Sequence, residues 1–386
     1  MSPSGLLALL FLITIANGLL RIPLKRKERS ESRVFRRSLT RRVDLKLVES
    51  TFHIATIYVG EERREFTVEL DTGSSTFVLP SAKCDSCVGR AKFQCQRESN
   101  YSTYITYMVG NGSGRFCEDE VRFAGLTVEH QQMVLLDEED EDLQLYESDG
   151  TIGLGFNADS LLVPFLSEIY TFVPIRVTYA PTPFIQNIRL QGLVTPTVFA
   201  FHFTRDGGEF TLGGSDPAHY QGNLAYADVI PFQTSWSVRL EGFHIGSIDA
   251  GNCGNKHCSV VIDSGSAFIS VPDSFDNTVF LTLNSMVPHL GIGTFGKSNS
   301  TGVRFYVREN EIRFLKPIHI SIAGSNFTLQ PEDYTSPANI PDKEDLYQIE
   351  IAMYPAQSWI LGKTFMRKVF TEFDVDRSRI GFAPSK

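Results

Sequence analysis

The chain contains one short phrase twice. Residues 70 to 80 read LDTGSSTFVLP, and residues 262 to 272 read IDSGSAFISVP. An Asp, a Gly, a Ser and a Pro fall at the same offsets in the two copies, which are 192 residues apart. Two unrelated Asp-Ser-Gly turns would not be expected to agree over such a stretch. The repeat therefore predicts two related halves, each contributing one Asp.

The length and the strand pattern agree with this duplication. A chain of 386 residues exceeds the size at which a single core usually stops growing. From Thr51 onward, short runs rich in Val, Ile, Phe, Tyr and Thr are separated by Gly, Asn, Asp or Pro, which is typical of β-strands. DGTIGLG at 149–155 follows the first Asp at a distance comparable to that of SWILGKT at 358–364 from the second. The predicted fold is mostly β and bilobal, with two β lobes related by a pseudo-two-fold axis.

Asp71 and Asp263 are the candidate catalytic residues. If the lobes pack about the pseudo-two-fold axis, the two carboxyl groups meet across it. Two carboxyl groups at hydrogen-bond distance cannot both ionise, so they share one proton over a range of acidic pH. One then acts as general base toward a water molecule, and the other donates its proton to the carbonyl oxygen under attack. The pair therefore predicts acid-dependent hydrolysis of an amide bond.

The residues that follow each Asp have predicted supporting roles. Gly73 and Gly265 let the backbone approach the opposite carboxyl group, where a Cβ atom would intrude. Ser74 and Ser266 are expected to donate hydrogen bonds to the outer carboxylate oxygens and so hold the pair coplanar. Both copies of the motif are intact.

Beyond these motifs, the chain resembles the pepsin-type aspartic endopeptidases from about Leu19 to Lys386. The resemblance is carried by RIPLKRK (21–27), FTVELDTGSSTFVLP (66–80), ITYMVGNGSGRFCEDEV (105–121), SDGTIGLG (148–155) and SWILGKTFMRKVFTEFDVDRSRIGFAP (358–384). It implies a substrate cleft, a flap hairpin on which Tyr107 and Gly110 contact the substrate, an extended peptide or protein substrate, and neither cofactor nor metal. Both Asp motifs lie in one chain, so a monomer is expected.

Some positions depart from the family pattern. Val78 stands where the family has a tryptophan that hydrogen-bonds the flap tyrosine, and Met108 stands where a glycine is usual. Asn111 heads a glycosylation sequon on the same hairpin, where a glycan would obstruct the cleft, so we expect it to be unused or regulatory. The first two departures support an alternative from another class, a catalytically silent pepsin-like binding protein. A structural protein is a third reading, but it gives no reason for paired Asp loops.

Glu69 suggests a specificity. Strand side chains alternate, so Glu69 faces the same side as Asp71, toward the cleft. In the family this position is aliphatic and lines the pocket for the residue before the scissile bond. The acidic run DEEDED at 137–142 resembles the next wall of that pocket. These residues suggest a substrate-binding role for Glu69 and tolerance of Lys or Arg in the pocket; alternatively, Glu69 points to the strand edge and the run is a solvated loop.

The N-terminal region predicts a secretory precursor. Residues 1–18 read as a signal peptide, because the apolar run Leu6 to Ala16 is too short to span a bilayer and small residues follow it. A signal anchor is the alternative. Residues 19–50 carry eleven Lys/Arg against four acidic residues, so a net charge of −9 leaves −16 on the rest of the chain. We expect a basic propeptide (19–45) that lies on the acidic body, followed by an N-terminal lobe (46–218) and a C-terminal lobe (219–386).

The alternative for the basic arm is binding to anionic surfaces. The acidic body argues against nucleic acid as the main partner, and no membrane partner is expected. The predicted partners are therefore the substrate and the chain's own propeptide. The predicted location is the secretory pathway, with the product secreted or lysosomal/vacuolar.

Six cysteines fit this oxidising route. Cys253 and Cys258 are alone in the C-terminal half, so we expect them to pair. The remaining four allow three pairings: Cys84, Cys87, Cys95 and Cys117. A zinc site at Cys84-x-x-Cys87 is disfavoured, because no second close pair or His cluster follows it. The candidate glycosylation sites are Asn100, Asn299 and Asn326.

Overall fold

The structure is a computed structural model. It describes the backbone of residues 20–26 and residues 53–108, 110–156, 181–205, 207–231, 233–251, 253, 258–295, 302–354 and 358–386. The predicted signal peptide, most of the predicted propeptide and Asn299 lie outside the described residues.

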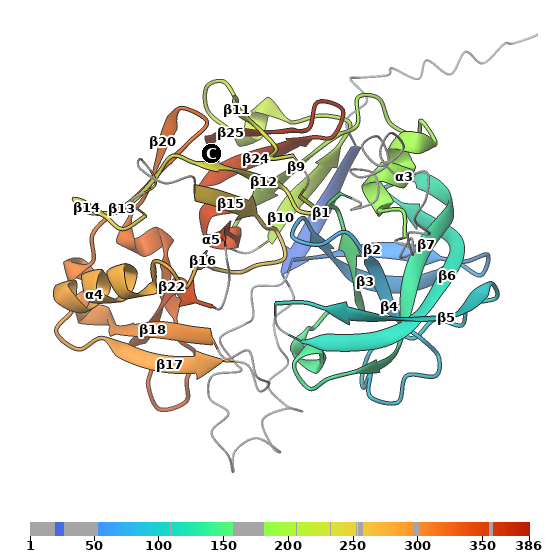
Figure 1. Cartoon of the computed structure of the whole chain (residues 1–386), viewed down its shortest axis with the longest axis horizontal. Helices are drawn as coiled ribbons and strands as arrows, with labels where there is room; N and C mark the ends of the chain where they lie inside the picture. Colours follow the sequence, from blue (N-terminus) through green and yellow to red (C-terminus); the bar gives the residue numbers. More distant parts are fainter. Residues whose placement is uncertain are drawn as a thin grey trace, which may run out of the picture.

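The fold is mostly β, as predicted, and the described residues form three sheets (Figure 1). The 13-stranded sheet runs in the order β11 (Ala225–Asp228), β25 (Arg379–Pro384), β24 (Val369–Asp374), β9 (Val198–Phe203), β10 (Gly207–Leu212), β1 (Leu20–Arg26), β2 (His53–Val59), β3 (Arg64–Asp71), β8 (Gly150–Gly153), β4 (Phe77–Pro80), β7 (Leu126–Glu139), β6 (Asn111–Phe123) and β5 (Glu98–Thr106).

The other two sheets lie in the C-terminal half. The 8-stranded sheet contains β12 (Ser237–Leu240), β15 (Cys258–Ile262), β23 (Trp359–Leu361), β16 (Ile269–Val271), β22 (Leu346–Met353), β18 (Gly302–Arg308) and β17 (Gly291–Phe295), with β21 (Thr335–Pro337) beside β22. The 4-stranded sheet contains β14 (Ile248–Asp249), β13 (Gly242–Ile245), β19 (Ile318–Ile322) and β20 (Ser325–Leu329).

The helices are short. Among the described residues the α-helices are α3 (Phe184–Leu190), α4 (Asp276–Met286) and α5 (Lys363–Met366), and the 3-10 helices are η2 (Leu143–Leu145), η3 (Pro217–His219), η4 (Glu309–Phe314) and η5 (Pro331–Asp333). None of the helices in the described part of the chain has the length and apolarity needed to cross a bilayer.

The predicted duplication appears in the strand pairing. In the first half, β8 pairs parallel with β3 and antiparallel with β4. In the second half, β23 pairs parallel with β15 and antiparallel with β16. Asp71 is the last residue of β3, and Asp263 directly follows β15. Each Asp is therefore delivered by the same local arrangement of three strands.

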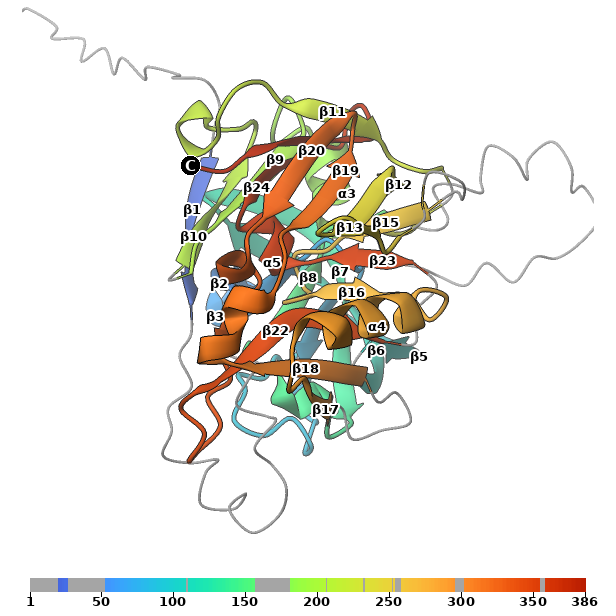
Figure 2. The ribbon, with the colours of Figure 1, turned by 90° about the vertical axis from the view of Figure 1, so that its left-hand side faces the viewer.

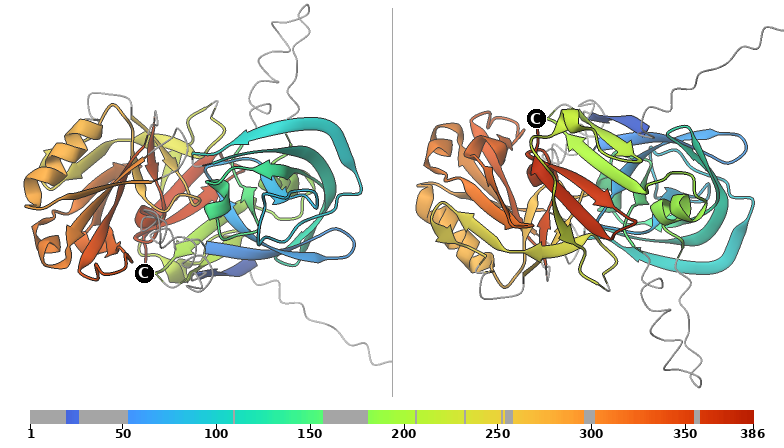
Figure 3. Two further views of the ribbon diagram at one scale, coloured as in Figure 1. Left: turned by 90° about the horizontal axis from the view of Figure 1, so that it is seen from below. Right: turned by 90° about the horizontal axis from the view of Figure 1, so that it is seen from above.

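The large sheet extends across the predicted lobe boundary. The C-terminal strand β24 pairs with β9, and β25 pairs with β24. Figure 3 shows the C-terminal strands β24 and β25, in red, between the two halves of the elongated molecule. The boundary between residues 218 and 219 thus divides the sequence but does not divide this sheet.

Aromatic packing joins the halves behind the Asp loops. The buried Trp236 ring lies 4.4 Å from that of Phe156 and 5.1 Å from that of Phe373 between centroids. Its indole N–H donates a hydrogen bond of 2.9 Å to the Leu154 carbonyl. Aromatic pairs of this kind contribute about 0.5–1.5 kcal/mol beyond their buried area. The segment that contacts Trp236 also bonds the first Asp loop, because the Leu154 N–H donates to the Asp71 carbonyl at 2.7 Å.

Strand β1 lies inside the large sheet. It pairs antiparallel with β10, from Leu20 opposite Leu212 onward, and with β2, where Lys25 lies opposite Ile54. Figure 2 shows β1 beside β10 at the edge of the view. A segment of the predicted propeptide is therefore a central strand of the sheet.

The cysteines form three disulfides. Cys253 bonds Cys258, in agreement with the prediction. Among the four others, the structure selects Cys84–Cys87 and Cys95–Cys117. The bond within Cys84-x-x-Cys87 uses the sulfur atoms that a zinc site would have required.

Candidate active site

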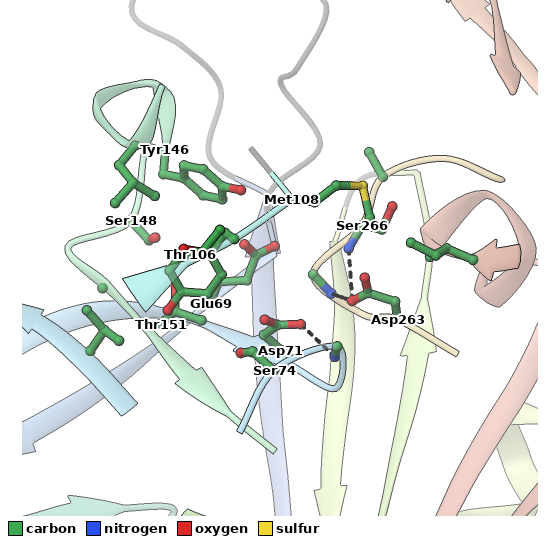
Figure 4. A pocket seen from close by; sticks show the side chains of 18 of the residues that line it. Glu69, Asp71, Ser74, Thr106, Met108, Tyr146, Ser148, Thr151, Asp263 and Ser266 are labelled. Atoms are coloured by element: carbon green, nitrogen blue, oxygen red, sulfur yellow. Dashed lines mark hydrogen bonds between the residues drawn. The ribbon is translucent and has the colours of Figure 1, made fainter. Parts of the chain in front are cut away.

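Each Asp carboxylate is held by the backbone of its own loop. The Gly73 N–H donates to Asp71 Oδ1 at 2.8 Å, and the Gly265 N–H donates to Asp263 Oδ1 at 2.8 Å. The Ser266 N–H adds a bond of 3.2 Å to the same oxygen of Asp263. Figure 4 shows both carboxyl groups at the floor of one cavity.

Each loop also touches the opposite carboxyl group. A Cβ atom added to Gly73 would lie 2.6 Å from Asp263 Oδ1, and one added to Gly265 would lie 2.4 Å from Asp71 Oδ1. Real Cβ atoms do not approach oxygen this closely. The backbone approach predicted for the two glycines is therefore present, and it brings the two carboxyl groups together.

The environment favours one shared proton. Asp71 and Asp263 are each only 8% exposed. Burial raises the pKa of Asp263 well above its ordinary value, and the negative charge of Asp71 raises it further. The pair therefore resists losing its last proton, because two adjacent carboxyl groups do not readily carry two negative charges.

The expectation for the serine hydroxyls is not met. The Ser74 hydroxyl is buried and has no hydrogen-bond partner among the described residues. The Ser266 hydroxyl donates to the Phe268 carbonyl at 3.5 Å. The conformation of the second loop directs the Ser266 hydroxyl to a backbone carbonyl, and backbone N–H groups of both loops donate to the carboxylates instead.

The sequence reasoning missed Thr72 and Ser264, the residues directly after each Asp. The Thr72 hydroxyl donates to the Ile262 carbonyl at 2.7 Å, and the Ser264 hydroxyl donates to the Leu70 carbonyl at 2.6 Å. Each side chain thus reaches across to the strand that carries the other Asp. The sequence does carry a signal for them, because a hydroxyl residue directly follows the Asp in both copies of the phrase.

A cavity of about 380 Å³ opens above the carboxyl groups. Its lining comes from both halves of the chain and is largely apolar. The apolar residues include Val78, Leu136, Leu143, Tyr146, Phe268 and Ile360. A mostly apolar hollow with a few convergent polar groups is typical of a ligand site.

The turn between β5 and β6 covers this cavity. The Tyr107 N–H donates to the Gly110 carbonyl at 3.0 Å. Gly110 has a φ of +96°, and a Cβ atom there would lie 2.8 Å from Leu143, so glycine is required for two reasons. Met108 projects over the cavity toward Ser266 (Figure 4).

The Tyr107 hydroxyl is buried and has no hydrogen-bond partner among the described residues. Burial raises its pKa, as do the negative charges of Asp71 and Glu69. Its ring packs on the apolar cluster that contains Val78 and Leu136. This agrees with the expectation that Val78, in place of tryptophan, leaves the tyrosine without its polar partner.

Glu69 lies on the cavity side of β3, as strand alternation predicted. Phe66, Val68 and Leu70 enter the core on the other face. The carboxylate is only 2% exposed and accepts a hydrogen bond of 2.6 Å from Lys363 Nζ, which is 1% exposed. The alternative that Glu69 points to the strand edge is therefore wrong, and the chain itself supplies a cation for it.

The acidic run 137–142 does not line the cavity among the described residues. Glu139 Oε2 accepts a hydrogen bond of 2.8 Å from Arg90 Nη1. Asp140 Oδ2 accepts bonds from the Asn111 backbone N–H at 2.8 Å and from Asn111 Nδ2 at 3.1 Å. The expected acidic wall is thus replaced by internal contacts, and the Asn111 amide is engaged. Asn100 and Asn326 are exposed.

Arg90 was not anticipated from the sequence. It lines the cavity, its side chain is 11% exposed, and it also donates to the Leu143 carbonyl. Burial lowers its pKa, and the nearby Glu139 opposes that effect. No local pattern marks this arginine, because its partners are about 50 residues away.

Comparison with known proteins agrees with this geometry. Residues 52–385 match the family model of the eukaryotic aspartyl proteases. The chain therefore belongs to the eukaryotic aspartyl protease family, and it is an aspartic-type endopeptidase.

Similar proteins include a renin, a pepsin and a gastricsin. Renin-2 of Mus musculus is 29% identical over 351 residues, which cover 85% of this chain and 78% of the relative. Pepsin B of Canis lupus familiaris is 28% identical over 353 residues, covering 87% and 82%. Gastricsin of Suncus murinus is 26% identical over 344 residues, covering 85% and 80%.

Proposed function

We propose that this aspartic endopeptidase hydrolyses extended peptides at acidic pH, with a water molecule activated between Asp71 and Asp263. The observation that carries the proposal is the reciprocal approach of the two loops. Gly73 lies against one carboxyl group and Gly265 against the other, at distances that exclude a Cβ atom. The raised pKa of Asp263 supports a singly protonated pair.

The chemistry follows from one shared proton. The ionised carboxylate takes a proton from water as the water oxygen attacks the peptide carbonyl carbon, and the protonated carboxyl group donates to the carbonyl oxygen. A tetrahedral diol forms. The carbon–nitrogen bond then breaks as the amine receives a proton from one carboxyl group, while the diol returns a proton to the other. The pair ends with one proton, as it began.

An apolar side chain suits the described cavity. Its lining is mainly apolar, and Tyr107, Met108 and Gly110 lie at the turn above it. We infer that this turn is a flap that closes on the substrate. The ion pair with Lys363 removes the main argument for a basic residue before the scissile bond, because Glu69 already has an ammonium partner.

The enzyme is proposed to be made as a zymogen with residues 19–45 as its propeptide. A basic segment on an acidic body is held by charge attraction that weakens as carboxylates become protonated. The position of β1 between β10 and β2 supports the idea that this segment is part of the folded precursor. Three disulfides support passage through an oxidising secretory compartment, with the product secreted or lysosomal/vacuolar.

The test uses purified precursor incubated from pH 3 to 7 with a diverse peptide pool, with cuts identified by mass spectrometry. The matched control is Asp263→Asn, which keeps the shape of the side chain and removes the titrating group. We expect cuts at acidic pH after apolar residues, and none with the variant.

The alternative is a catalytically silent binding protein. Val78 and Met108 suggested it from the sequence, but both carboxyl groups and both supporting glycines are in place. Absence of cuts at every pH, with removal of residues 19–45 verified, would overturn the proposed function in favour of this alternative.

A further inference from the structure

A buried ion pair spans the two halves of the molecule. Glu69 belongs to β3 in the first half, and Lys363 begins α5 in the second, 294 residues later. Their side chains are 2% and 1% exposed, and the distance between Oε1 and Nζ is 2.6 Å. Both residues line the cavity that contains the catalytic pair.

Stability alone gives little reason for such a pair. Removing two charges from water is expensive, and the attraction between them often does no more than offset that penalty. Apolar residues of similar volume would serve a structural role at least as well. The location of the pair is therefore its more informative property.

The pair is attached to both catalytic loops. Glu69 precedes Asp71 by two residues on the same face of β3. The Lys363 backbone N–H donates to the Ser266 carbonyl at 2.8 Å, in the loop that carries Asp263. Figure 4 shows Glu69, Asp71 and Asp263 around one cavity. A charge on either member of the pair therefore acts on the catalytic carboxyl groups through a buried, poorly screened space.

We propose that Glu69 and Lys363 are positioning residues that widen the pH range over which the catalytic pair holds one proton. Lys363 extends that range on the acidic side, and Glu69 extends it toward neutral pH. This inference rests on the proposed function of the Asp71 and Asp263 pair.

The direction of each effect follows from its charge. The ammonium of Lys363 attracts the single negative charge of the catalytic pair, so it opposes full protonation. Burial raises the pKa of Glu69 to about 7, against the opposing effect of Lys363. Glu69 thus becomes negative as the pH nears neutral, and its charge raises the pKa of Asp263, so it opposes loss of the shared proton.

Other charged groups face the same space. The cavity is also lined by Arg90, Tyr107, Tyr146, Asp149 and Arg304. Arg90 is paired with Glu139, and Asp149 Oδ2 accepts hydrogen bonds of 2.7 Å from the backbone and hydroxyl of Thr67. The variants leave these residues in place, so a comparison among them isolates the effect of the Glu69 and Lys363 pair.

The test measures the proton on the catalytic pair directly. Protein labelled with 13C at the aspartate side-chain carboxyl carbons is titrated by NMR, and the two resonances are assigned by their loss in Asp71→Asn and Asp263→Asn. The pH profile of kcat/KM is recorded in parallel. The variants are Glu69→Gln, Lys363→Met and the double variant.

We expect each single variant to narrow the pH range over which the catalytic pair holds one proton, and the two variants to do so from opposite sides. Glu69→Gln lowers the upper apparent pKa of the pair by about one unit and leaves the lower one in place. Lys363→Met raises the lower apparent pKa by about one unit. The double variant matches Lys363→Met, because a buried Glu69 without its ammonium is already protonated. If Glu69→Gln does not fold, the double variant, which carries neither charge, still tests the effect on the lower apparent pKa.

The matched control is Glu350→Gln, which breaks the buried pair between Glu350 and Arg367 at the other end of α5, outside the cavity lining. It should lower stability without changing either apparent pKa of the catalytic pair. Unchanged apparent pKa values in both single variants, or pKa shifts equal to those of the control, would overturn the inference. Absence of cleavage by the wild type would instead overturn the proposed function, while the NMR titration would still decide the inference.

Discussion

Thr72 and Ser264 exchange hydrogen bonds across the two halves of the molecule. The Thr72 N–H donates to Ser264 Oγ at 3.0 Å, and the Ser264 N–H donates to Thr72 Oγ1 at 2.9 Å. Each residue directly follows one Asp of the proposed catalytic pair. This reciprocal pair, together with the two carbonyls its hydroxyls reach, fixes the separation of the carboxyl groups.

The first prediction concerns Thr72→Val, which keeps the shape and removes the hydroxyl. The Ser264 N–H and the Ile262 carbonyl lose their partner in a buried site, so we expect a loss of about 1–3 kcal/mol in the free energy of unfolding. We also expect kcat/KM to fall, because the carboxyl groups are no longer held in register. Urea unfolding and steady-state kinetics measure both.

The control for that variant is Thr371→Val. Thr371 is fully buried, and its hydroxyl has no partner among the described residues. The same substitution there should leave stability unchanged or raised. Equal losses at both positions would mean that the hydroxyl network has no special role.

The second prediction concerns Gly265→Ala. The added Cβ atom would lie 2.4 Å from Asp71 Oδ1, so the carboxyl group must move. We expect kcat/KM to fall on the order of 100-fold, since small displacements of reacting groups have effects of this size. Gly242→Ala serves as control, because its nearest contact is the flexible Ser321 Oγ at 3.3 Å. Retained activity in Gly265→Ala would contradict the close approach of the two loops.

The third prediction concerns the hairpin tip. Because the Tyr107 hydroxyl is buried without a partner among the described residues, Tyr107→Phe should leave the free energy of unfolding unchanged or raise it by up to about 1 kcal/mol. Tyr107→Ala should instead reduce kcat/KM by about tenfold or more, since the ring packs on the cluster with Val78. A large fall in the kcat/KM of Tyr107→Phe would show that the hydroxyl acts on the substrate.

The fourth prediction concerns stability and pH. The folded-state pKa of Glu69 is raised from 4.5 to about 7, so the folded protein binds an extra proton between these values. The stabilisation is fully present below pH 4.5 and is lost as the pH rises through about 7, with a slope of at most ~1.4 kcal/mol per pH unit from this group. Asp263 acts in the same direction.

Urea unfolding between pH 4 and 8 measures this slope. Glu69→Gln should flatten it, while Glu98→Gln, which affects the ion pair with Lys83 outside the cavity, should not. Stability that rises across the interval would contradict the assignment.

Much of the fold was predictable because it depends on short local motifs that occur twice in the sequence. The two Asp motifs, the glycines and the strand pattern specify two similar loops whose halves must associate. The pairing of Cys253 with Cys258 followed from their isolation in the second half. Such features depend on residue type and near neighbours, which are visible in the sequence.

The partners of buried polar groups were decided by the tertiary structure. Lys363 meets Glu69 from 294 positions away, and Arg90 occupies the cavity through contacts with Glu139 and Leu143. Backbone N–H groups donate to the Asp carboxylates in place of the serine hydroxyls next to Gly73 and Gly265. A buried charge or hydroxyl must find a partner, but packing of distant segments determines which one is within reach. The sequence by itself therefore determined the two Asp motifs proposed as the catalytic pair and the strand pattern that carries them, and only the tertiary structure decided the electrostatic surroundings of that pair.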